Sequence, residues 1–581
     1  MATTFTDSHP REAAPDLLLV GGKILTADSA SRIVEAMVVA DGKVLAAGNN
    51  AEMTALAGKS ATCIDLGGRT VIPGLIDGHA HMDNEGLKNI FPSLTGCRSI
   101  ADVQDRIAEL ARHAKPGEWI VTMPIGTPPY YRDGAECLKE ARYPSRHDLD
   151  KAAPVNPVYI KPILGYWRGL GGFPLVSIAN SRALQLAGIG RETLPPWGGI
   201  HMDRDLTTGE PNGIFYEWTQ ISLVEMTLMR VAPAFSNEDR LPALRRSMAM
   251  YNAFGTTSVV ETHGVMDEVI QTYRALEQAG NCTVRAHLVI SPSWKGASPQ
   301  DVAAMVRDVY GWCAGRGRGS DMVRVGGIYT RIGGSGADNR LRAAAMPYLN
   351  FSGYAPDSEV SRELVRELVL EAARNGMRVS TIYADCLELY EEANRVRSIT
   401  ENRWIISHLR TLTPDEIARI RDLGVVVTTQ TNRWIADQGS VLRARLGPAR
   451  EDEIVPLRRL TEAKVPFGLA TDNTPVSLFH PLWHCVARRN ARTGEQIAFS
   501  QRLSREEALR AATYGGACLT FEENLKGTLE PGKFADMAVL DQDYLSVPED
   551  RIKDMRSVMT LVGGRIVHQS DDAPVTVAAQ H

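Results

Sequence analysis

Short, nearly continuous apolar runs alternate with amphipathic helical patterns along most of the chain after residue 70. Stretches such as 361–375 and 413–424 carry the helical period between two of these runs. The eight runs occupy residues 70–81, 256–264, 283–291, 322–334, 377–385, 402–409, 424–432 and 465–473. Apolar strands that alternate with helices are typical of a parallel sheet covered on both faces. Eight such units predict an α/β fold, a (β/α)₈ TIM-like barrel over residues 71–523.

The spacing between the first two runs is anomalous, because residues 82–255 separate them. We therefore predict a large subdomain inserted after the first strand, over residues 90–250. Aromatic and glycine residues are frequent in it, at 126–134, 165–173, 195–200 and 215–218. Loops of this kind can cover a barrel mouth and form an apolar pocket. The alternative is that these aromatic residues pack the insertion onto the barrel.

The two ends of the chain have a different pattern, with short apolar runs separated by Gly-Gly or Asp-Gly. This pattern predicts antiparallel strands joined by tight turns. Both ends contain the letters LVGG followed by a basic residue. We predict one small β-sandwich built from residues 16–70 and 524–570. Two unrelated hairpins are the alternative.

Polar residues that can bind a metal follow several of the predicted strands. They are His79, His81, Glu261, His263, His408 and Asp472. In a barrel of this kind the chemistry lies at the carboxyl ends of the strands. Residues i and i+2 of a strand share a face, so His79 and His81 should bind one ion together. Imidazole and carboxylate ligands suit Zn²⁺ and similar divalent ions.

We predict a metal site formed by His79, His81 and Asp472, with His263 or His408 as a further ligand. A single histidine at a strand end is more often a hydrogen-bonded core residue, so the site depends on the whole constellation. His480 and His484 lie four residues apart and could form a helical metal pair. A capped surface helix is the favoured interpretation of that pair.

Composition narrows the classes of function. Hydrophobic residues make up 44% and charged residues 23% of the 581 residues, as in ordinary globular proteins. The net charge is −5 and there is no basic stripe, so nucleic acid is not an expected partner. There is no signal-like N-terminus and no apolar run of about 18 residues, so no membrane association is expected. The 8 cysteines include no CxxC pair, which favours a reducing cytoplasm. A homodimer is the default assembly.

Several motifs resemble those of one known family. "VIPGLIDGHAH" (71–81) is similar to the first-strand motif of the amidohydrolase superfamily of metal-dependent hydrolases. "SREEALRAATYGGACLTF" (504–521) followed by "GTLEPGKFADMAVLD" (527–541) resembles the closing signature of that superfamily. The inserted motifs at 178–189 and 198–217 resemble the amidohydrolase 3, or YtcJ-like, subgroup. N-substituted formamide deformylases belong to that subgroup.

The resemblance implies the roles of individual residues. His79 and His81 fall on the paired histidines of the family, His408 on the strand 6 histidine and Asp472 on the strand 8 aspartate. Two positions depart from the family pattern. They are Tyr329, where strand 4 often carries a carboxylated lysine, and Thr381, where strand 5 usually carries a histidine. No lysine occurs in 296–463, so a lysine bridge between two metals is excluded there. Glu261 and His263 on strand 2 could compensate for the missing lysine and histidine, an expectation that rests on their position alone.

The resemblance therefore implies a hydrolase of C–N bonds with one divalent ion, expected to be Zn, with Mn, Fe and Co as alternatives. Asp472 would serve as general base and then general acid, and His408 would polarise the carbonyl if it is not a ligand. The expected substrate is a small hydrophobic or aromatic amide, formamide or carbamate. Candidate substrate contacts are Tyr329, Arg331, Tyr383, Trp167 and Glu261. A lyase or hydratase on the same scaffold, and a non-catalytic binding protein, are the alternatives.

Overall fold

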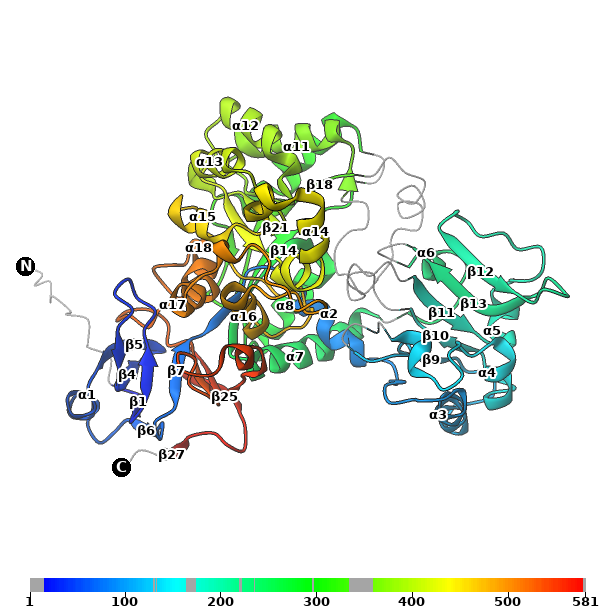
Figure 1. Cartoon of the computed structure of the whole chain (residues 1–581), viewed down its shortest axis with the longest axis horizontal. Helices are drawn as coiled ribbons and strands as arrows, with labels where there is room; N and C mark the ends of the chain where they lie inside the picture. Colours follow the sequence, from blue (N-terminus) through cyan, green and yellow to red (C-terminus); the bar gives the residue numbers. More distant parts are fainter. Residues whose placement is uncertain are drawn as a thin grey trace, which may run out of the picture.

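The computed structural model describes residues 15–128, 131, 133–162, 174–218, 222–234, 236–294, 297–333 and 359–577. Figure 1 shows three parts side by side. A β-rich part that contains both chain ends lies on one side, a barrel lies in the middle, and a lobe formed early in the sequence lies on the other side. Within the described residues no helix has the length and apolar character needed to cross a bilayer.

The middle part is a parallel barrel. Its strands, in order around the sheet, are β23 (Phe467–Gly468), β22 (Val426–Thr429), β21 (Ile405–Leu409), β20 (Val379–Ile382), β17 (Val323–Tyr329), β15 (Arg285–Ile290), β14 (Thr256–Val265) and β8 (Leu75–Asp77). All seven neighbouring pairs are parallel. Each strand falls on one of the eight predicted runs, with only β14 extending beyond its run, by one residue, so the predicted TIM-like barrel is confirmed.

Helices on the outside of the barrel follow the amphipathic patterns in the sequence. α11 (Arg362–Arg374) buries Val365, Leu368, Val369 and Ala372, whose spacing places them on one helical face. Its first turn is capped by Ser361, whose side chain accepts a hydrogen bond from the backbone N–H of Leu364. α8 (Asp267–Gln278), α12 (Leu387–Val396) and α13 (Pro414–Asp422) cover neighbouring strands in the same way.

Two antiparallel-rich sheets, which we call the terminal domain, contain strands from both ends of the chain. One has the order β27 (Val575–Val577), β6 (Thr62–Asp65), β1 (Leu17–Val20), β4 (Ala36–Ala40), β5 (Lys43–Gly48). The other has the order β26 (Arg565–Gln569), β25 (Ser557–Val562), β24 (Met537–Leu540), β7 (Thr70–Pro73), β2 (Lys23–Leu25), β3 (Ile33–Val34). Side chains of both sheets, including Leu19, Met37, Ile24 and Val539, share one hydrophobic cluster.

The lobe between β8 and β14, which we call the insertion lobe, has its own five-stranded sheet. The order is β12 (Ile200–Arg204), β13 (Pro211–Glu217), β11 (Leu175–Ala179), β10 (Val158–Ile160), β9 (Ile120–Thr122). Successive residues of β10 face opposite sides, because Val158 and Ile160 pack with α3 (Ile100–His113), whereas Tyr159 packs with α5 (Ser181–Leu186). α7 (Asn237–Ala253), which extends three residues beyond the range expected for the insertion, packs against α8 and β14 of the barrel.

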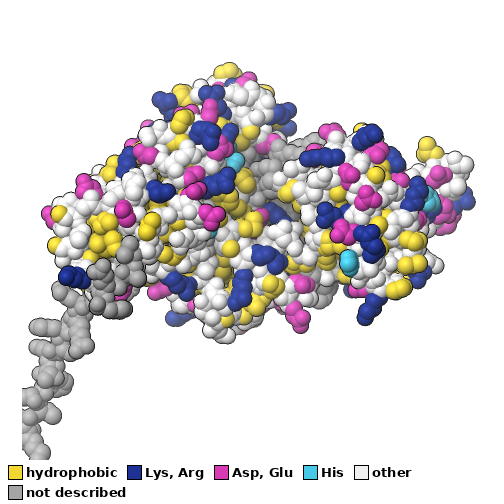
Figure 2. Space-filling model, turned by 90° about the horizontal axis from the view of Figure 1, so that it is seen from below, with side chains coloured by type: hydrophobic (Ala, Val, Ile, Leu, Met, Phe, Trp, Pro, Cys, Tyr) yellow, Lys and Arg dark blue, Asp and Glu magenta, His cyan; other side chains and the backbone are white. Residues whose placement is uncertain are grey.

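The described aromatic residues of the insertion lobe serve mainly to pack it. Trp197 and Phe215 belong to one of its cores, and Tyr131 packs against a cluster that also contains Ala243 of α7. The 165–173 motif, which includes Trp167, lies outside the described residues. On the face shown in Figure 2, basic and acidic side chains are interspersed rather than segregated by sign.

A buried ion pair joins the barrel to the terminal domain. Arg285 of β15 donates from Nε and Nη2 to the two carboxylate oxygens of Asp536, at 2.7 and 3.0 Å. The same guanidinium lies over the ring of Phe534, with its Cζ 4.0 Å from the ring centroid. Because both charges are buried, each depends on the other for compensation.

We expect Asp536→Asn to lower the free energy of unfolding by about 3 kcal/mol, because it leaves a buried guanidinium without its counter-charge. The matched control is Glu388→Gln, which breaks the exposed Arg362–Glu388 pair. That change should cost at most about 0.5 kcal/mol. Denaturant titrations followed by circular dichroism measure both variants. Equal effects of the two substitutions would contradict the linking role of Arg285.

Candidate metal centre and active site

Four imidazoles and one carboxylate meet at the carboxyl ends of the barrel strands. His79 and His81 follow β8, His263 belongs to β14, His408 belongs to β21 and Asp472 follows β23. All five side chains are buried. The Nε2 atoms of His79 and His408 are 2.9 Å apart. Asp472 Oδ1 lies 3.1 Å from His81 Nε2 and 3.6 Å from the Nε2 atoms of both His79 and His408.

These side chains form two overlapping sets of possible ligands that share His79. One set is His79, His263 and His408, and the other is His79, His81 and Asp472. In each set the ligand atoms lie within 4.8 Å of one another. Among the described residues, no other group of His, Cys, Asp or Glu side chains comes together in this way. The structure thus brings together all five residues that the sequence analysis singled out as metal ligands.

The His79–His81 segment is positioned by tertiary contacts rather than by strand alternation, because β8 ends at Asp77. The N–H of Ala80 donates to Val260 O at 3.0 Å, which ties the segment to β14. The N–H of Asp472 donates to His79 O at 3.1 Å, which ties it to the last strand. The expectation that the two histidines share a strand face therefore needs correction, although their rings lie near each other, with centroids 5.2 Å apart.

Left-handed backbone conformations aim two of the groups. His408 has a φ of 58° and Asp472 a φ of 53°. Such conformations are uncommon outside glycine and are found disproportionately at functional sites. They turn each side chain away from the direction that a regular strand would impose. Local backbone strain is thus part of how this chain assembles the site.

Three polar residues that the sequence analysis did not identify hold the possible ligands in place. The Thr262 hydroxyl hydrogen-bonds with Nδ1 of His79, which leaves Nε2 facing His408 and Asp472. Gln430 Nε2 donates to Asp472 Oδ2, while Oδ1 faces the imidazoles. Metal-binding histidines and carboxylates commonly have such outer hydrogen bonds, which orient them and set the tautomer.

The third residue, Asn473, clamps the backbone of His81. Its Oδ1 accepts from the N–H of His81 at 3.1 Å, and its Nδ2 donates to the carbonyl of His81 at 2.7 Å. Nδ2 also donates to Glu85 Oε2 at 2.9 Å. Its position directly after Asp472 was the only sequence signal for this role, because the contacts join segments almost 400 residues apart. Asn473 therefore fixes His81 relative to Asp472.

The electrostatics of the site favour neutral His79, His263 and His408 beside an ionised Asp472. His81 is the exception: burial opposes its protonation, but the hydrogen bond to Asp472 and the charge of that carboxylate outweigh burial and raise the pKa of His81. Burial, reinforced by the nearby His408, holds the pKa of His79 well below its usual value. Burial opposes ionisation of Asp472, but His408 and His81 outweigh it and hold the pKa of Asp472 well below its usual value. Neutral imidazole and ionised carboxylate are the protonation states that bind metal ions. The donor set therefore fits a divalent cation.

Three of the expected substrate contacts surround this centre. The ring of Tyr329 lies against that of His263, with centroids 4.6 Å apart. The ring centroid of Tyr383 is 6.1 Å from that of His408. The Cζ atom of Arg331 lies 5.8 Å from the ring centroid of Tyr383. All three side chains are thus close to possible metal ligands.

Two other sequence-derived candidates have contacts elsewhere. Glu261 Oε1 accepts hydrogen bonds from the N–H of Met82 at 2.8 Å and the hydroxyl of Tyr273 at 2.9 Å. Burial and the charge of Asp83 raise the pKa of Glu261 to about 8. These contacts favour a positioning role over the substrate contact that we expected. The Thr381 hydroxyl accepts from the phenol of Tyr390, in the outer helix α12, at 3.1 Å.

The pair His480 and His484 lies apart from the candidate centre, on α16 (Phe479–Ala487). His484 is buried, and its Nδ1 is 3.3 Å from the hydroxyl of Thr431. Neither histidine belongs to the two sets of possible ligands. Within the described residues the pair joins no group of three possible ligands, and the burial of His484 differs from the surface helix that was favoured from the sequence.

Comparisons with known proteins agree with this geometry. The model of the amidohydrolase family matches residues 62–568. N-substituted formamide deformylase of Arthrobacter pascens is 25% identical, over 94% of this chain and 97% of that protein. The putative amidohydrolase YtcJ of Bacillus subtilis is 23% identical, over 94% of this chain and 98% of that protein. An uncharacterized metal-dependent hydrolase from Pyrococcus horikoshii superposes with a TM-score of 0.62 at 21% identity, covering 92% of this chain and 99% of that one.

We expect His79→Ala and His81→Ala to lose most of the bound metal while the protein stays folded, because each removes a ring nitrogen from the centre. Elemental analysis gives the metal content per chain, and circular dichroism checks the fold. His147→Ala, at an exposed position in the insertion lobe, is the control. Full metal content in either variant would show that the first-strand histidines are not ligands.

We expect Thr262→Val to weaken metal binding by about 10–100-fold, because it removes the hydrogen bond that orients His79 while keeping the side-chain volume. Thr428→Val is the matched control, since Thr428 is equally buried on a barrel strand and its hydroxyl has no hydrogen-bond partner within the described residues. Competition with a chelator of known affinity measures both. Equal metal affinities for the two variants would rule out an orienting role for Thr262.

Proposed function

This chain belongs to the amidohydrolase family, and from that premise we propose that it hydrolyses a C–N bond of a small amide, formamide or carbamate with one divalent metal ion. The observation that carries the proposal is the convergence of His79, His81, His263, His408 and Asp472 at the barrel mouth. Two imidazole nitrogens that face each other at 2.9 Å, beside a carboxylate, form a set of electron donors that suits a divalent cation.

The proposed ion is Zn²⁺, with His79, His81 and Asp472 as ligands and His263 or His408 completing the set. When bound, such an ion acts as a Lewis acid and makes a water molecule acidic enough to attack near neutral pH. One ion rather than two is proposed, because no lysine is present in 296–463 to supply a carboxylated bridge. Thr381, at the strand 5 position, is bonded to Tyr390 and offers no ligand atom.

Asp472 is the proposed proton carrier. Its Oδ2 is held by Gln430, so Oδ1 is the oxygen that faces His79, His81 and His408. In the proposed reaction Oδ1 accepts a proton from water as the water oxygen bonds to the substrate carbonyl carbon. The same proton then passes to the leaving nitrogen as the C–N bond breaks. The products are an amine and a carboxylic acid, or a carbonic acid monoester when the substrate is a carbamate, which balances the reaction without any other reactant.

His408 and the aromatic residues around it would orient the substrate. His408 would polarise the carbonyl when it is not a ligand, and the 3.6 Å between its Nε2 and Asp472 Oδ1 supports this role by placing it next to the proposed proton carrier. Tyr329 and Tyr383 provide ring surfaces next to His263 and His408. These rings suit a substrate with a hydrophobic or aromatic body, which is the class proposed here.

The domain boundaries, the cellular setting and the oligomeric state are also proposed. We propose the division into a terminal domain of 16–70 and 524–570, a barrel of 71–523 and an insertion of 90–250. Two strands of the terminal sheets, β7 (Thr70–Pro73) and β27 (Val575–Val577), extend beyond the proposed bounds of the terminal domain. All eight cysteines are free, which supports the proposal of a reducing, cytoplasmic setting. A homodimer is proposed as the commonest closed assembly.

We expect Asp472→Asn to lower kcat by about 10²–10⁴-fold, because asparagine keeps the shape but cannot accept and return the proton. The assay is amine release from a panel of aryl amides and formamides, with the metal content measured on the same samples. Release of an amine and an acid in equal amounts separates hydrolysis from a lyase or hydratase reaction.

A variant that retains its metal and keeps kcat within a few-fold of the parent would show that Asp472 is not the proton carrier. His147→Ala serves again as the control, because it lies far from the centre and should leave kcat and metal content unchanged.

A further inference from the structure

Two arginines near His408 have no carboxylate partner within the described part of the chain. Arg410 follows β21 two residues after His408, and Arg433 lies in the helical segment Asn432–Asp437 after β22. Other arginines nearby are paired, since Arg362 binds Glu388 at 2.6 Å. Two cations without a counter-charge beside a candidate active site suggest a role in binding a negative charge.

The two guanidinium groups lie against one pair of aromatic rings. The Cζ atom of Arg410 is 5.6 Å from the ring centroids of both Tyr383 and Trp434. The Cζ atom of Arg433 is 4.8 Å from that of Trp434. The Tyr383 and Trp434 rings are themselves 6.1 Å apart. We call Arg410, Arg433, Tyr383 and Trp434 the arginine–aromatic cluster.

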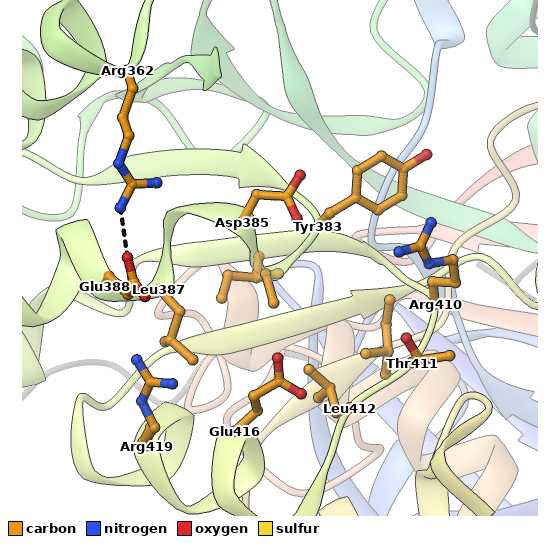
Figure 3. Close-up of a pocket in the computed structure, with 13 residues that line it drawn as sticks. Arg362, Tyr383, Asp385, Leu387, Glu388, Arg410, Thr411, Leu412, Glu416 and Arg419 are labelled. Atoms are coloured by element: carbon orange, nitrogen blue, oxygen red, sulfur yellow. Dashed lines mark hydrogen bonds and ion pairs between the residues drawn. The ribbon is translucent and has the colours of Figure 1, made fainter. Parts of the chain in front are cut away.

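Figure 3 shows how Arg410 differs from the other cations of the cavity that it lines, which has a volume of about 410 Å³. Arg362 is joined to Glu388 on one side of the view, whereas Arg410 lies on the other side, below Tyr383, with no such bond. Asp385 lines the same cavity but forms no ion pair with Arg410 within the described residues.

Buried hydrogen-bond donors in the cluster provide a second, independent observation. Trp434 is 5% exposed, and its indole Nε1 has no acceptor within the described residues. The Nε of Arg433 is also shielded from solvent and has no acceptor there. Buried N–H groups without an acceptor are rare and costly in folded proteins. Both unsatisfied atoms are donors, so the missing group is an acceptor.

The cluster lies close to the candidate metal centre. The Tyr383 ring centroid is 6.1 Å from that of His408, and the charge of Arg331, 5.8 Å from the Tyr383 ring, adds to the positive field. The strands that precede the two arginines, β21 and β22, are neighbours in the barrel. A small molecule can therefore contact the cluster and the candidate metal centre at the same time.

We propose that the arginine–aromatic cluster binds a carboxylate of the substrate, so that the enzyme acts on amides that carry both a carboxylate and an apolar or aromatic group. This inference rests on the proposed function and narrows its substrate class. Guanidinium forks match carboxylates through paired, charge-assisted hydrogen bonds, and flat rings beside them fit a planar group. The indole N–H of Trp434 supplies a further donor.

Binding of simple probes tests the inference without turnover. The probes are phenylacetate and its neutral isostere phenylacetamide, titrated calorimetrically into the metal-loaded protein. Phenylacetate should bind at least about tenfold more tightly, and Arg410→Gln and Arg433→Gln should each remove most of that difference. Arg362→Gln is the matched control, since Arg362 lines the same cavity but is paired with Glu388.

A carboxylate bound by the metal instead of the cluster would give a different pattern. Its affinity would be unchanged in Arg410→Gln and Arg433→Gln and lost in His79→Ala. If the cluster binds the carboxylate, we expect the reverse: the preference for phenylacetate is lost in Arg410→Gln and Arg433→Gln and retained in His79→Ala. Equal binding of the two probes by the parent protein would overturn the inference.

Kinetics with N-formylphenylalanine and N-formylphenethylamine separate this inference from the proposed function. The carboxylate-bearing formamide should have a kcat/KM at least about tenfold higher, and Arg410→Gln should lower only that value. Hydrolysis of both at equal rates would overturn the inference and leave the proposed function standing. Selective binding of phenylacetate without amine release from any amide in the panel would count against the proposed function and leave the anion site standing.

Discussion

The closure of the barrel between its first and last strands is the constraint on which the candidate site depends. Beyond the end of β8, the N–H of Gly78 donates to Leu469 O at 2.8 Å, and the N–H of Asp472 donates to His79 O at 3.1 Å. These bonds place His79, which follows the first barrel strand, beside the carboxylate of Asp472, which follows the eighth. Without that closure, residues almost 400 positions apart could not face a common point.

The same junction shows how the fold accommodates several buried polar groups in a small volume. Asp77 accepts from the N–H groups of both His79 and Thr471 at 3.1 Å, and burial raises its pKa to about 6. Asn473 forms a two-sided clamp on His81. Because Asp77 and Asn473 bond to the backbone on both sides of the junction, the segment around the histidines has little freedom, and such rigidity is what a metal centre requires.

The sequence was sufficient for the parts of the structure that depend on local pattern. The eight apolar runs predicted the eight strands, and the polar residues at their ends predicted the five side chains that meet at the mouth. Contacts between distant segments could not be predicted in this way. Thr262, Gln430 and Asn473 are ordinary polar residues in the sequence, and only the register of β14, β22 and the last strand makes them partners of the centre. The left-handed backbone at His408 and Asp472 has no local signal either, because neither residue is a glycine.

The structure separates the groups assigned to chemistry from those assigned to recognition. His79, His81 and Asp472 are buried and held by several hydrogen bonds, so their geometry is set by the barrel itself. Arg410 and Arg433 emerge from segments that follow β21 and β22, where substitution disturbs no barrel hydrogen bond. Residues of this kind can change between related enzymes while the metal centre stays intact. Substrate preference in this chain should therefore depend on the sector of the mouth next to His408, whereas the type of reaction depends on the closure between the first and last strands.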